Sequence, residues 1–373
     1  MNKNSLKTIS PVDGSLYVER EYATPTTIQA SLADARRAAI SIAALPISER
    51  IAICQRALNY FDEHRNTIAE QISWQMGRPI AHSGGEVSGV IERARYMMDI
   101  AEVSLADIVP KPSAGFKRFV RKQPLGTVLV VAPWNYPLLT TTNAVFPALL
   151  AGNSVILKPS AQTPLAAEHF AAAFDEAGLP AGGLQCLHLD HAATSRLIEQ
   201  KGVDFVCFTG SVEAGRRIAM TAAQRFIGAG LELGGKDPAY VMPDANIDEA
   251  VAQLVDGAFF NAGQSCCGIE RIYVHQHLYK DFVENYSEAV KALKLGNPLD
   301  TGTTLGPVAK QAAAKFIREQ ISAAVNQGAK GTLTASNFQA DDQNGCYLAP
   351  QVLINVSHEM SIMRDESFGP VVG

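Results

Sequence analysis

The spacing of apolar residues predicts two kinds of secondary structure along the 373-residue chain. In the first hundred residues, apolar positions recur three and four apart, as in Ile51, Cys54 and Leu58, which is typical of amphipathic helices. Residues 1–22 indicate instead an extended hairpin with a turn at Pro11–Gly14. We expect three helices in this region, at residues 27–44, 49–76 and 86–105.

Beyond residue 126 the pattern changes to near-continuous apolar runs separated by helical stretches. Runs such as TVLVV and SVILK are typical of strands buried on both faces of a parallel sheet. Strands and helices alternate at the spacing of right-handed crossovers. The predicted fold class is therefore α/β, with a Rossmann-like doubly wound parallel sheet.

After Gly235 a new series of strands and helices predicts a second α/β domain. We expect a dinucleotide-binding domain at residues 1–108 and 125–234, a hairpin arm at 109–124, and the second domain at 235–373. Within the arm, FKRFVRKQ predicts a half-buried strand. A solvated arm and a strand that pairs with a partner subunit explain it equally well. The last residues, SFGPVVG, end within a predicted strand, so we expect the second domain to be incomplete.

Composition narrows the class of protein. Hydrophobic residues make up 47% and charged residues 18%, as in ordinary globular proteins. The net charge of −5 gives no reason to expect nucleic-acid binding. No export signal and no apolar run of about 18 residues is present, so we expect a cytoplasmic protein without a membrane partner. Six cysteines without C-x-x-C spacing, and an H-x-x-H pair at His188 and His191 that lacks a third ligand, predict no metal site.

A cysteine and a glutamate are the leading candidates for chemistry. Cys266 lies in GQSCCG between Gly263 and Gly268, where backbone N–H groups of a turn would lower the pKa of a thiol. We interpret the adjacent Cys267 as a packing residue. Glu232 stands between two leucines, and an apolar setting suits a carboxyl group to work as a general base. The ordinary alternatives are a buried cysteine that only packs and a solvated glutamate.

Three further candidates follow predicted strands. Asn135 in PWNYPL is held between prolines and could donate its amide to an oxyanion. Lys158 in LKPSAQTP could bind ribose or phosphate at a strand end. Ser211 in FTGSVEAG could cap a helix whose N-terminus suits a pyrophosphate, with Gly210 permitting a tight turn and Gly215 close packing. Taken singly, each has an ordinary reading as a turn asparagine, a loop lysine or a capping serine.

Together these segments resemble the aldehyde dehydrogenase superfamily over nearly the whole chain. The six segments occur in that family's order: PWNYPL, LKPSAQTP, FTGSVEAG, LELGGKDP, GQSC and ESFGPV. The resemblance implies a catalytic second domain, an oligomerisation hairpin, a homo-oligomer, and NAD or NADP as coenzyme. It also implies that Cys266 is the nucleophile and Glu232 the general base. The Asn135 side chain and the Cys266 N–H group would then form the oxyanion hole.

The resemblance also assigns coenzyme contacts. Lys158 would bind the adenosine ribose, Ser211 the pyrophosphate and Glu366 the nicotinamide ribose, with Phe368 packed beside it. The implied reaction oxidises an aldehyde to a carboxylic acid through a thiohemiacetal and a thioester on Cys266. The full set of implied coenzyme-binding residues is Pro133, Trp134, Lys158, Ser160, Ala161, Phe208, Thr209, Gly210, Ser211, Gly215, Leu233, Glu366 and Phe368.

Three departures from the family pattern modify these expectations. Ala161 stands where members that prefer NAD often carry Glu, so NADP should be tolerated and the preference stays open. Asn143 stands where succinate-semialdehyde members carry Arg, which favours an uncharged aldehyde. Many relatives also have Lys at the next position, which is Ala144 here. The sequence ends at Gly373, where relatives continue. The alternatives are a truncated, inactive relative that acts as a binding or structural protein, and a CoA-acylating dehydrogenase, a branch that does not use the glutamate.

Overall fold

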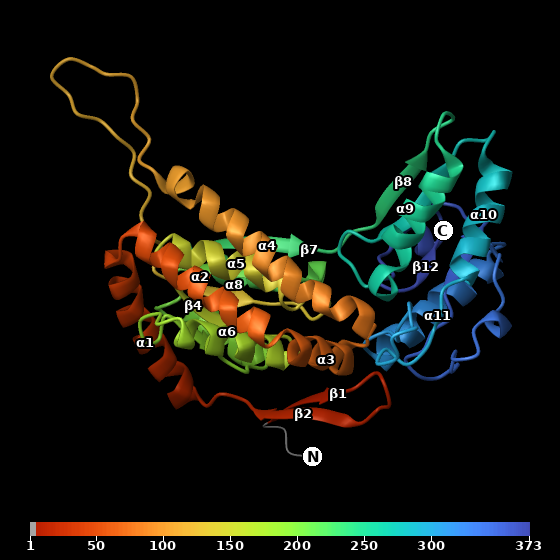
Figure 1. The fold of residues 1–373 in the computed structure, drawn as a ribbon, viewed down its shortest axis with the longest axis horizontal. Coiled ribbons are helices and arrows are strands. Elements are labelled where there is room, and N and C mark those ends of the chain that lie inside the picture. The colour runs from red at the N-terminus through yellow and green to blue at the C-terminus, as the bar shows by residue number, and fades with distance from the viewer. Residues whose placement is uncertain (1–4) are drawn as a thin grey trace. The chain divides into compact units, whose positions relative to one another are not determined.

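The computed structural model describes residues 5–373, which divide into two compact units. The first unit contains residues 5–7, Val18–Ile68 and Gly84–Glu232. The second contains Thr8–Tyr17, Ala69–Ser83 and Leu233–Gly373. Two stretches of the N-terminal hundred residues therefore belong to the second unit. Figure 1 shows the elements of both units.

The N-terminal elements follow the apolar pattern with one exception. The helix expected at residues 49–76 is wrong as a single element, because the chain breaks at His64 into two helices. There His64 leaves the helical region (φ −97°, ψ 10°), and its ring nitrogen Nδ1 lies 2.9 Å from the Tyr60 carbonyl oxygen. The elements are β1 (Ser5–Ile9), β2 (Leu16–Glu21), α1 (Pro25–Ala44), α2 (Ile47–Glu63), α3 (Arg65–Met76) and α4 (Ile80–Leu105).

A five-stranded sheet forms the centre of the first unit, in the order β5-β4-β3-β6-β7. Strands β3 and β4 are buried at every position, as the continuous apolar runs predict. They pair in parallel, as do β3 with β6 and β4 with β5. The elements are β3 (Thr127–Val131), α5 (Leu139–Leu150), β4 (Ser154–Lys158), α6 (Pro164–Glu176), β5 (Leu184–Cys186), α7 (His191–Glu199), β6 (Phe205–Gly210), α8 (Val212–Ala223) and β7 (Gly228–Leu233).

The strand order creates a point where the chain changes direction across the sheet. From β3 the chain proceeds through β4 to the edge strand β5, and α7 then returns it to the far side of β3. Right-handed crossovers place α5 and α6 on one face and α7 on the other. At such a switch point the loops after the two diverging strands move apart, which leaves a crevice for ligands. Here these are the loops that follow β3 and β6.

The arm between α4 and β3 differs from the prediction. No strand forms across FKRFVRKQ; only single bridges occur, Ile108 with Val120 and Ser113 with Phe116. Figure 1 shows the segment as a long loop that extends past the end of α4. An isolated two-stranded ribbon has too few neighbours to be stable, which explains the irregular backbone. Several of its apolar side chains are exposed, including Phe116 at 73%.

The second unit is also α/β. Strands β8 and β9 pair in parallel, as do β11 and β12, and the Ile272 N–H group donates to the Gly373 carbonyl at 2.9 Å. Its core packs the stacked rings of Phe282 and Tyr286 against α9. The elements are β8 (Asp237–Val241), α9 (Ile247–Phe259), the short helix η1 (Phe260–Gly263), β9 (Ile269–Val274), α10 (Tyr279–Lys291), α11 (Gln311–Asn326), β10 (Lys330–Gly331), the short helix η2 (Ala335–Asn337), β11 (Gln351–Ile354), α12 (Ser361–Arg364) and β12 (Val371–Val372).

Among residues 5–373 no single helix is both long and apolar enough to cross a bilayer. Helices α1 and α2 reach that length and hydropathy only when counted together, and they are bent by 119° at their junction.

Candidate active site

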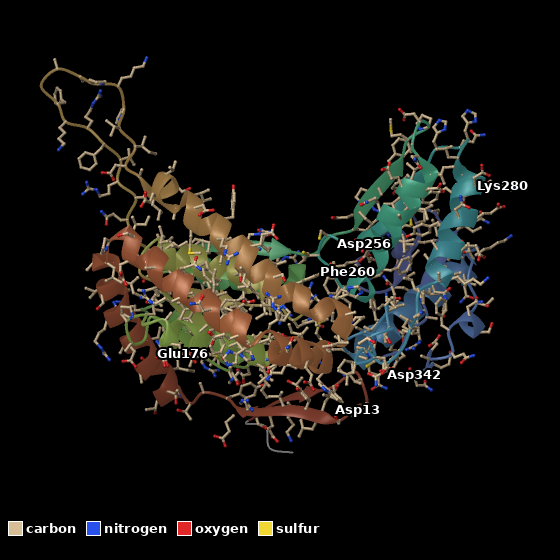
Figure 2. All side chains as sticks on the ribbon, in the orientation of Figure 1. Asp13, Glu176, Asp256, Phe260, Lys280 and Asp342 are labelled. Carbon is tan, nitrogen blue, oxygen red and sulfur yellow. The ribbon has the colours of Figure 1, made fainter. Side chains whose placement is uncertain are left out.

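The turn that carries Cys266 has an unusual backbone. Helix α9 ends at Phe259, and Phe260 and Asp256 are labelled there in Figure 2. Asn261 and Ala262 then adopt left-handed φ values of 55° each. Residues other than glycine rarely adopt this conformation, which costs about 1–3 kcal/mol per residue. The strain must therefore be offset by neighbouring contacts.

Buried amide groups supply those contacts. The Gln264 side chain donates to the Asn261 carbonyl at 3.0 Å and accepts from the Ala309 N–H group at 2.9 Å. The guanidinium Nε of Arg78, which is 2% exposed, donates to Asn261 Oδ1 at 3.0 Å. These bonds fix the turn two residues before Cys266. Sequence reasoning used Gln264 only as part of a motif and missed Arg78, whose partner is distant in the chain.

The pKa of the Cys266 thiol differs from the expectation. Cys266 is exposed, as a nucleophile requires. Burial raises the pKa of Cys266, the neighbouring Cys267 raises it further, and the backbone N–H groups of both residues lower it by less. The prediction of a lowered pKa is therefore wrong for this structure. The packing role predicted for Cys267 is also wrong, because Cys267 is exposed.

The loop at residues 366–369 packs against this turn. A Cβ atom on Gly263 would lie 2.2 Å from the Gly369 carbonyl oxygen, so no side chain fits there. Likewise, a Cβ atom on Gly234 would lie 2.0 Å from Glu366 Oε1. Burial, followed by the charge of Glu270, raises the pKa of Glu366. The second unit thus brings Cys266, Glu366 and the residues next to Leu233 into one neighbourhood.

A buried ion pair between Lys236 and Glu270 contacts the loop at residues 366–369. Lys236 Nζ contacts the Glu270 carboxylate, and both side chains are almost fully buried. The N–H groups of Ser367 and Phe368 donate to Glu270 at 2.8 and 2.9 Å. Burial lowers the pKa of Lys236, and the charge of Glu270 opposes that change. Sequence reasoning missed both residues, although Lys236 lies within LELGGKDP.

In the first unit, Asn135 is buried in the loop after β3, and a carboxylate fixes the helix that follows. Glu86 on α4 is 3% exposed, and its Oε2 accepts from the N–H groups of Leu138 and Leu139 at 2.9 and 3.2 Å. A carboxylate stabilises the positive end of a helix dipole. Glu86, which sequence reasoning missed, therefore sets the start of α5 and hence the loop of Asn135. Pro133 is buried and Trp134 half-buried in that loop.

The loops after β4 and β6 carry the predicted phosphate and ribose ligands. Lys158 is the last residue of β4 and is buried, and its carbonyl accepts from the Ala132 N–H group at 3.0 Å. Ser160 is half-buried beside it, and Ala161 is exposed. Lys158, at the end of β4, and Asn135, after β3, therefore lie at the carboxyl ends of adjacent strands.

Ser211 caps the 12-residue helix α8, where its hydroxyl accepts from the Ala214 N–H group at 3.3 Å. A Cβ atom on Gly210 would lie 2.7 Å from the Phe208 ring, and Thr209 stands between these two residues at the end of β6. Gly215 is buried on the same helix. The start of α8 lies after β6, on one side of the switch point, and the loop of Asn135 lies on the other. A buried lysine, a capped helix N-terminus and a switch point together fit a dinucleotide.

Glu232 is the penultimate residue of β7 and is exposed. The apolar setting expected from its flanking leucines is therefore absent, because alternation along a strand points neighbouring side chains to opposite faces. The exposed carboxylate can reach water.

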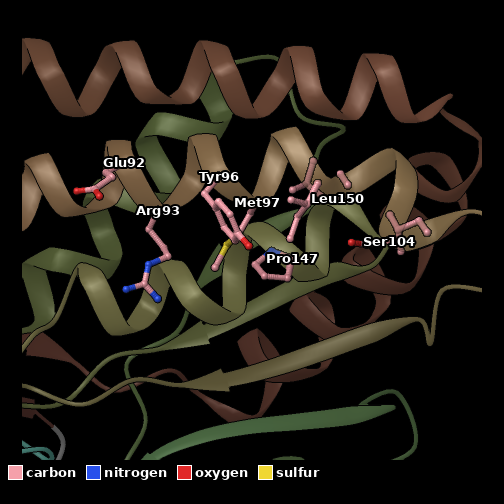
Figure 3. Close-up of a pocket in the computed structure, with 10 residues that line it drawn as sticks. Glu92, Arg93, Tyr96, Met97, Ser104, Pro147 and Leu150 are labelled. Atoms are coloured by element: carbon pink, nitrogen blue, oxygen red, sulfur yellow. The ribbon is translucent and has the colours of Figure 1, made fainter.

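Helices α4 and α5 border a cavity of about 490 Å³ (Figure 3). Near it, Arg93 Nη1 on α4 donates to Asn143 Oδ1 on α5 at 3.4 Å. The chain therefore has a guanidinium next to Asn143, although it comes from another helix. The lining residues are Glu92, Arg93, Tyr96, Met97, Ile100, Ala101, Ser104, Leu105, Pro147 and Leu150.

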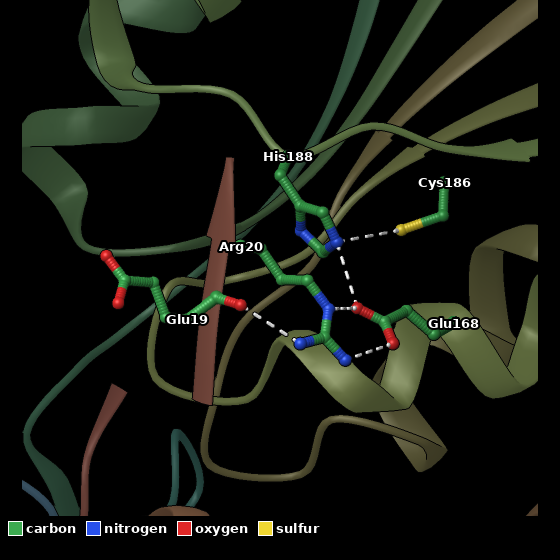
Figure 4. Close-up of polar contacts among 5 residues, drawn as sticks. All are labelled: Glu19, Arg20, Glu168, Cys186 and His188. Atoms are coloured by element: carbon green, nitrogen blue, oxygen red, sulfur yellow. Dashed lines mark hydrogen bonds and ion pairs between the residues drawn. The ribbon is translucent and has the colours of Figure 1, made fainter. Parts of the chain in front are cut away.

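A polar cluster connects strand β2, which carries Arg20, to the edge of the sheet at β5 (Figure 4). Arg20 donates to both carboxylate oxygens of Glu168, at 2.8 and 3.0 Å, and His188 Nε2 lies 3.0 Å from the same carboxylate. His188 is thus a half-buried structural residue, not the surface residue expected from the H-x-x-H pattern. In residues 5–373 no group of three or more His, Cys, Asp or Glu side chains could hold a metal ion.

These features define an α/β protein with the ligand edge of a dinucleotide-binding sheet and a second unit that presents an exposed cysteine on a strained turn. The sequence profile of the aldehyde dehydrogenase family matches residues 1–373. The chain belongs to that family of NAD(P)-dependent oxidoreductases.

Individual relatives agree with this assignment. The chain is 31% identical to a D-glyceraldehyde dehydrogenase (NADP(+)) of Picrophilus torridus over 99% of its own length and 75% of that relative. It is 32% identical to a succinate-semialdehyde dehydrogenase [NADP(+)] of Escherichia coli, covering 91% and 72% of the two chains. An E. coli NADP-dependent enzyme of solved structure matches with a TM-score of 0.94 at 29% identity, covering 100% and 77%. The predicted α/β fold with a parallel central sheet is confirmed.

Proposed function

We propose that the chain oxidises an aldehyde to a carboxylic acid with NAD or NADP, using Cys266 as nucleophile, Glu232 as general base and Asn135 as oxyanion donor. The observation that carries the proposal is the turn of Cys266. Its strained residues, Asn261 and Ala262, are held by buried amide and guanidinium groups, and it ends in an exposed thiol. Strained backbone that is held this firmly is typical of functional sites.

The covalent steps follow from the chemistry of these side chains. The Cys266 thiolate forms a bond to the carbonyl carbon, and the C=O π electrons move to oxygen. The Asn135 amide and the Cys266 N–H group stabilise the resulting oxyanion of the thiohemiacetal. Loss of hydride from that carbon restores the C=O bond as a thioester. Glu232 then takes a proton from water, the hydroxide adds to the thioester, and the C–S bond breaks to release the acid and the thiolate.

The coenzyme would be held by residues of the three strand-end loops and of the loop at 366–368. Lys158 would bind the adenosine ribose, the N-terminus of α8 with Ser211 the pyrophosphate, and Glu366 the nicotinamide ribose beside Phe368. Bound NAD(P)⁺ would supply the oxidation by accepting the hydride. Because Ala161 leaves no carboxylate next to Ser160, a ribose 2′-phosphate would meet no repulsion there. NADP is therefore tolerated as well as NAD.

Substitution of the two adjacent cysteines tests the nucleophile. Aldehyde-dependent formation of NAD(P)H, followed by its absorbance, should be lost in Cys266→Ala, by at least about 10³-fold. The matched variant Cys267→Ala should retain turnover within a few-fold. Turnover that survives in Cys266→Ala, or that is lost equally in both variants, contradicts the proposal.

The substrate follows from a panel of aldehydes. We propose an uncharged aldehyde, because position 143 is Asn; the nearby Arg93 makes succinate semialdehyde the informative comparison. A kcat/KM that is higher for succinate semialdehyde than for neutral aldehydes contradicts this choice. Strict dependence of turnover on CoA indicates the acylating alternative, and a folded protein that fails to bind NAD(P) indicates the inactive one.

We also propose that the arm at residues 109–124 joins copies of the chain into a homo-oligomer. Its apolar side chains, which include Phe116, Phe119 and Val120, are exposed and interleaved with basic residues. Exposed apolar groups in such number favour association. A cytoplasmic location suits the thiol chemistry, since the cysteines of residues 5–373 are all unpaired.

A further inference from the structure

Glu270, which follows Cys266 by four residues in the chain, forms a buried ion pair with Lys236 that the proposed reaction does not use. The exposed fractions of the two side chains are 6% and 5%. Burying two charges is costly because each loses its hydration, and an apolar pair of similar size would often be no less stable. The contacts of the pair should therefore explain its presence.

Those contacts converge on the loop at residues 366–368. Glu270 Oε2 accepts from the Ser367 N–H group at 2.8 Å, and Oε1 accepts from the Phe368 N–H group at 2.9 Å. Lys236 Nζ also donates to Ser367 Oγ at 3.1 Å. The carboxylate thus binds two successive peptide groups, and hydrogen bonds to an ionised acceptor are stronger than neutral ones.

The loop needs such a restraint because its backbone is strained. Phe368 has a φ of 52°, in the left-handed region that bulky residues rarely adopt. Such a conformation persists only where the surroundings over-determine it. Glu270 binds the N–H group of Phe368 itself and that of the residue before it, so it fixes the strained peptide directly.

The loop also has little free space. Glu366 precedes the two bound peptide groups and lies against Gly234, and Gly369 follows them and lies against Gly263 in the turn of Cys266. A Cβ atom on Gly369 would lie 2.2 Å from Ile317 Cδ1, which closes a third side. A small displacement of the peptide groups that Glu270 holds would consequently displace the Glu366 carboxylate.

We propose that Glu270, with Lys236 as its counter-charge, is a positioning residue that sets Glu366 and Phe368 for binding the nicotinamide ribose. Glu270 acts through the main chain of the loop and touches no reactant. The inference rests on the proposed roles of Glu366 and Phe368, and it extends them to a buried residue that contacts neither substrate nor coenzyme.

Glu270→Gln tests the proposal with little change in shape. A glutamine offers one acceptor oxygen in place of two, turns its own NH₂ toward a backbone N–H group, and leaves Lys236 without a carboxylate partner. The dissociation constant for NADP⁺ and for NAD⁺, measured by calorimetry on the full chain, should rise roughly tenfold, as for one lost charge-assisted hydrogen bond. Alkylation of Cys266 by iodoacetamide should change by less than about twofold, since the turn keeps its own bonds.

A double-mutant cycle separates positioning from general destabilisation. In a Glu366→Gln background, adding Glu270→Gln should weaken coenzyme binding by less than about twofold, because the group that it positions is already gone. Additive effects of the two substitutions contradict the proposal. The control is Glu288→Gln in the same unit, which breaks an exposed pair with Lys291 and should leave the dissociation constant unchanged.

A second variant covers the case in which Glu270→Gln does not fold. The double replacement Lys236→Met and Glu270→Met removes both buried charges and keeps the volume. It should bind coenzyme as weakly as Glu270→Gln, and wild-type affinity overturns the inference. Failure of the proposed function is seen separately, as turnover that persists in Cys266→Ala, while the coenzyme measurements decide the role of Glu270.

Discussion

Cys266 has a second exposed thiol, Cys267, beside it, and this neighbour raises the pKa of Cys266. After burial, Cys267 is the largest cause that raises the pKa of Cys266. Replacing Cys267 by Ala removes a like charge, so the pKa of Cys266 should fall. The pH dependence of Cys266 alkylation by iodoacetamide, followed by peptide mass spectrometry, should therefore move to lower pH. An unchanged or higher midpoint contradicts this reading, and Cys346→Ala serves as the control.

Glu168 gives a prediction for stability against pH. Burial raises its pKa, but hydrogen bonds from His188 and Arg20, with their charges, outweigh burial and lower it to about 2. A carboxyl group whose pKa is lowered on folding stabilises the protein above its unfolded pKa of about 4.5, and this contribution is lost as the pH falls toward 2.

The free energy of unfolding of Glu168→Gln should therefore lie below that of the wild type at pH 7, and the gap should narrow between pH 4.5 and pH 2. Urea denaturation at several pH values measures it. Glu284→Gln, in an exposed pair with Lys280, should follow the wild type throughout. A difference in the free energy of unfolding that stays constant with pH contradicts a role for the lowered pKa of Glu168.

At the scale of elements, the start of helix α5 depends on one distant carboxylate. Glu86→Ala would leave the N–H groups of the buried Leu138 and of Leu139 without their acceptor. We expect a loss of about 2–3 kcal/mol in the free energy of unfolding, measured by urea denaturation. The control is Glu92→Ala on the same helix, which is exposed and should change stability by less than about 0.5 kcal/mol. Equal effects of the two variants contradict the capping role.

The same elements explain what the sequence could predict. Strands β3 and β4 are buried at every position, so their apolar runs locate them nearly to the residue. The break at His64 has no glycine or proline to mark it, and its cause is a local contact with Tyr60. The expected strand in FKRFVRKQ fails because a strand needs neighbours that this segment does not have among residues 5–373.

In the candidate site, too, local motifs could be predicted from the sequence and distant contacts could not. Cys266, Asn135 and Lys158 lie in recognisable motifs, and their roles stay predictions. The substitution of Cys266 described above addresses the first of them. Glu86 and Glu270 could not be found from the sequence, because each binds main-chain N–H groups 52 and 97 positions away and no motif encodes such a contact. The left-handed Asn261 and Ala262 were equally invisible, since neither residue is the glycine that usually signals this backbone.

For the whole molecule, the arm at residues 109–124 should determine the oligomeric state. Replacing Phe116, Phe119 and Val120 together by Ser removes exposed apolar surface without touching the sheet. Light scattering coupled to size-exclusion chromatography should show an oligomer for the wild type and a smaller species for the variant. A wild-type monomer, or an oligomer that survives the substitutions, contradicts the proposed role of the arm.

The covalent mechanism is the central claim, and the Glu232→Gln variant tests it most directly. Without a base to activate water, the thioester on Cys266 should accumulate. Intact mass measurement after mixing with aldehyde and NADP⁺ should show one acyl group per chain, located on the Cys266 peptide, and about one equivalent of NADPH released in a single burst. Continued turnover at the wild-type rate, or a burst without an adduct on Cys266, would contradict the account.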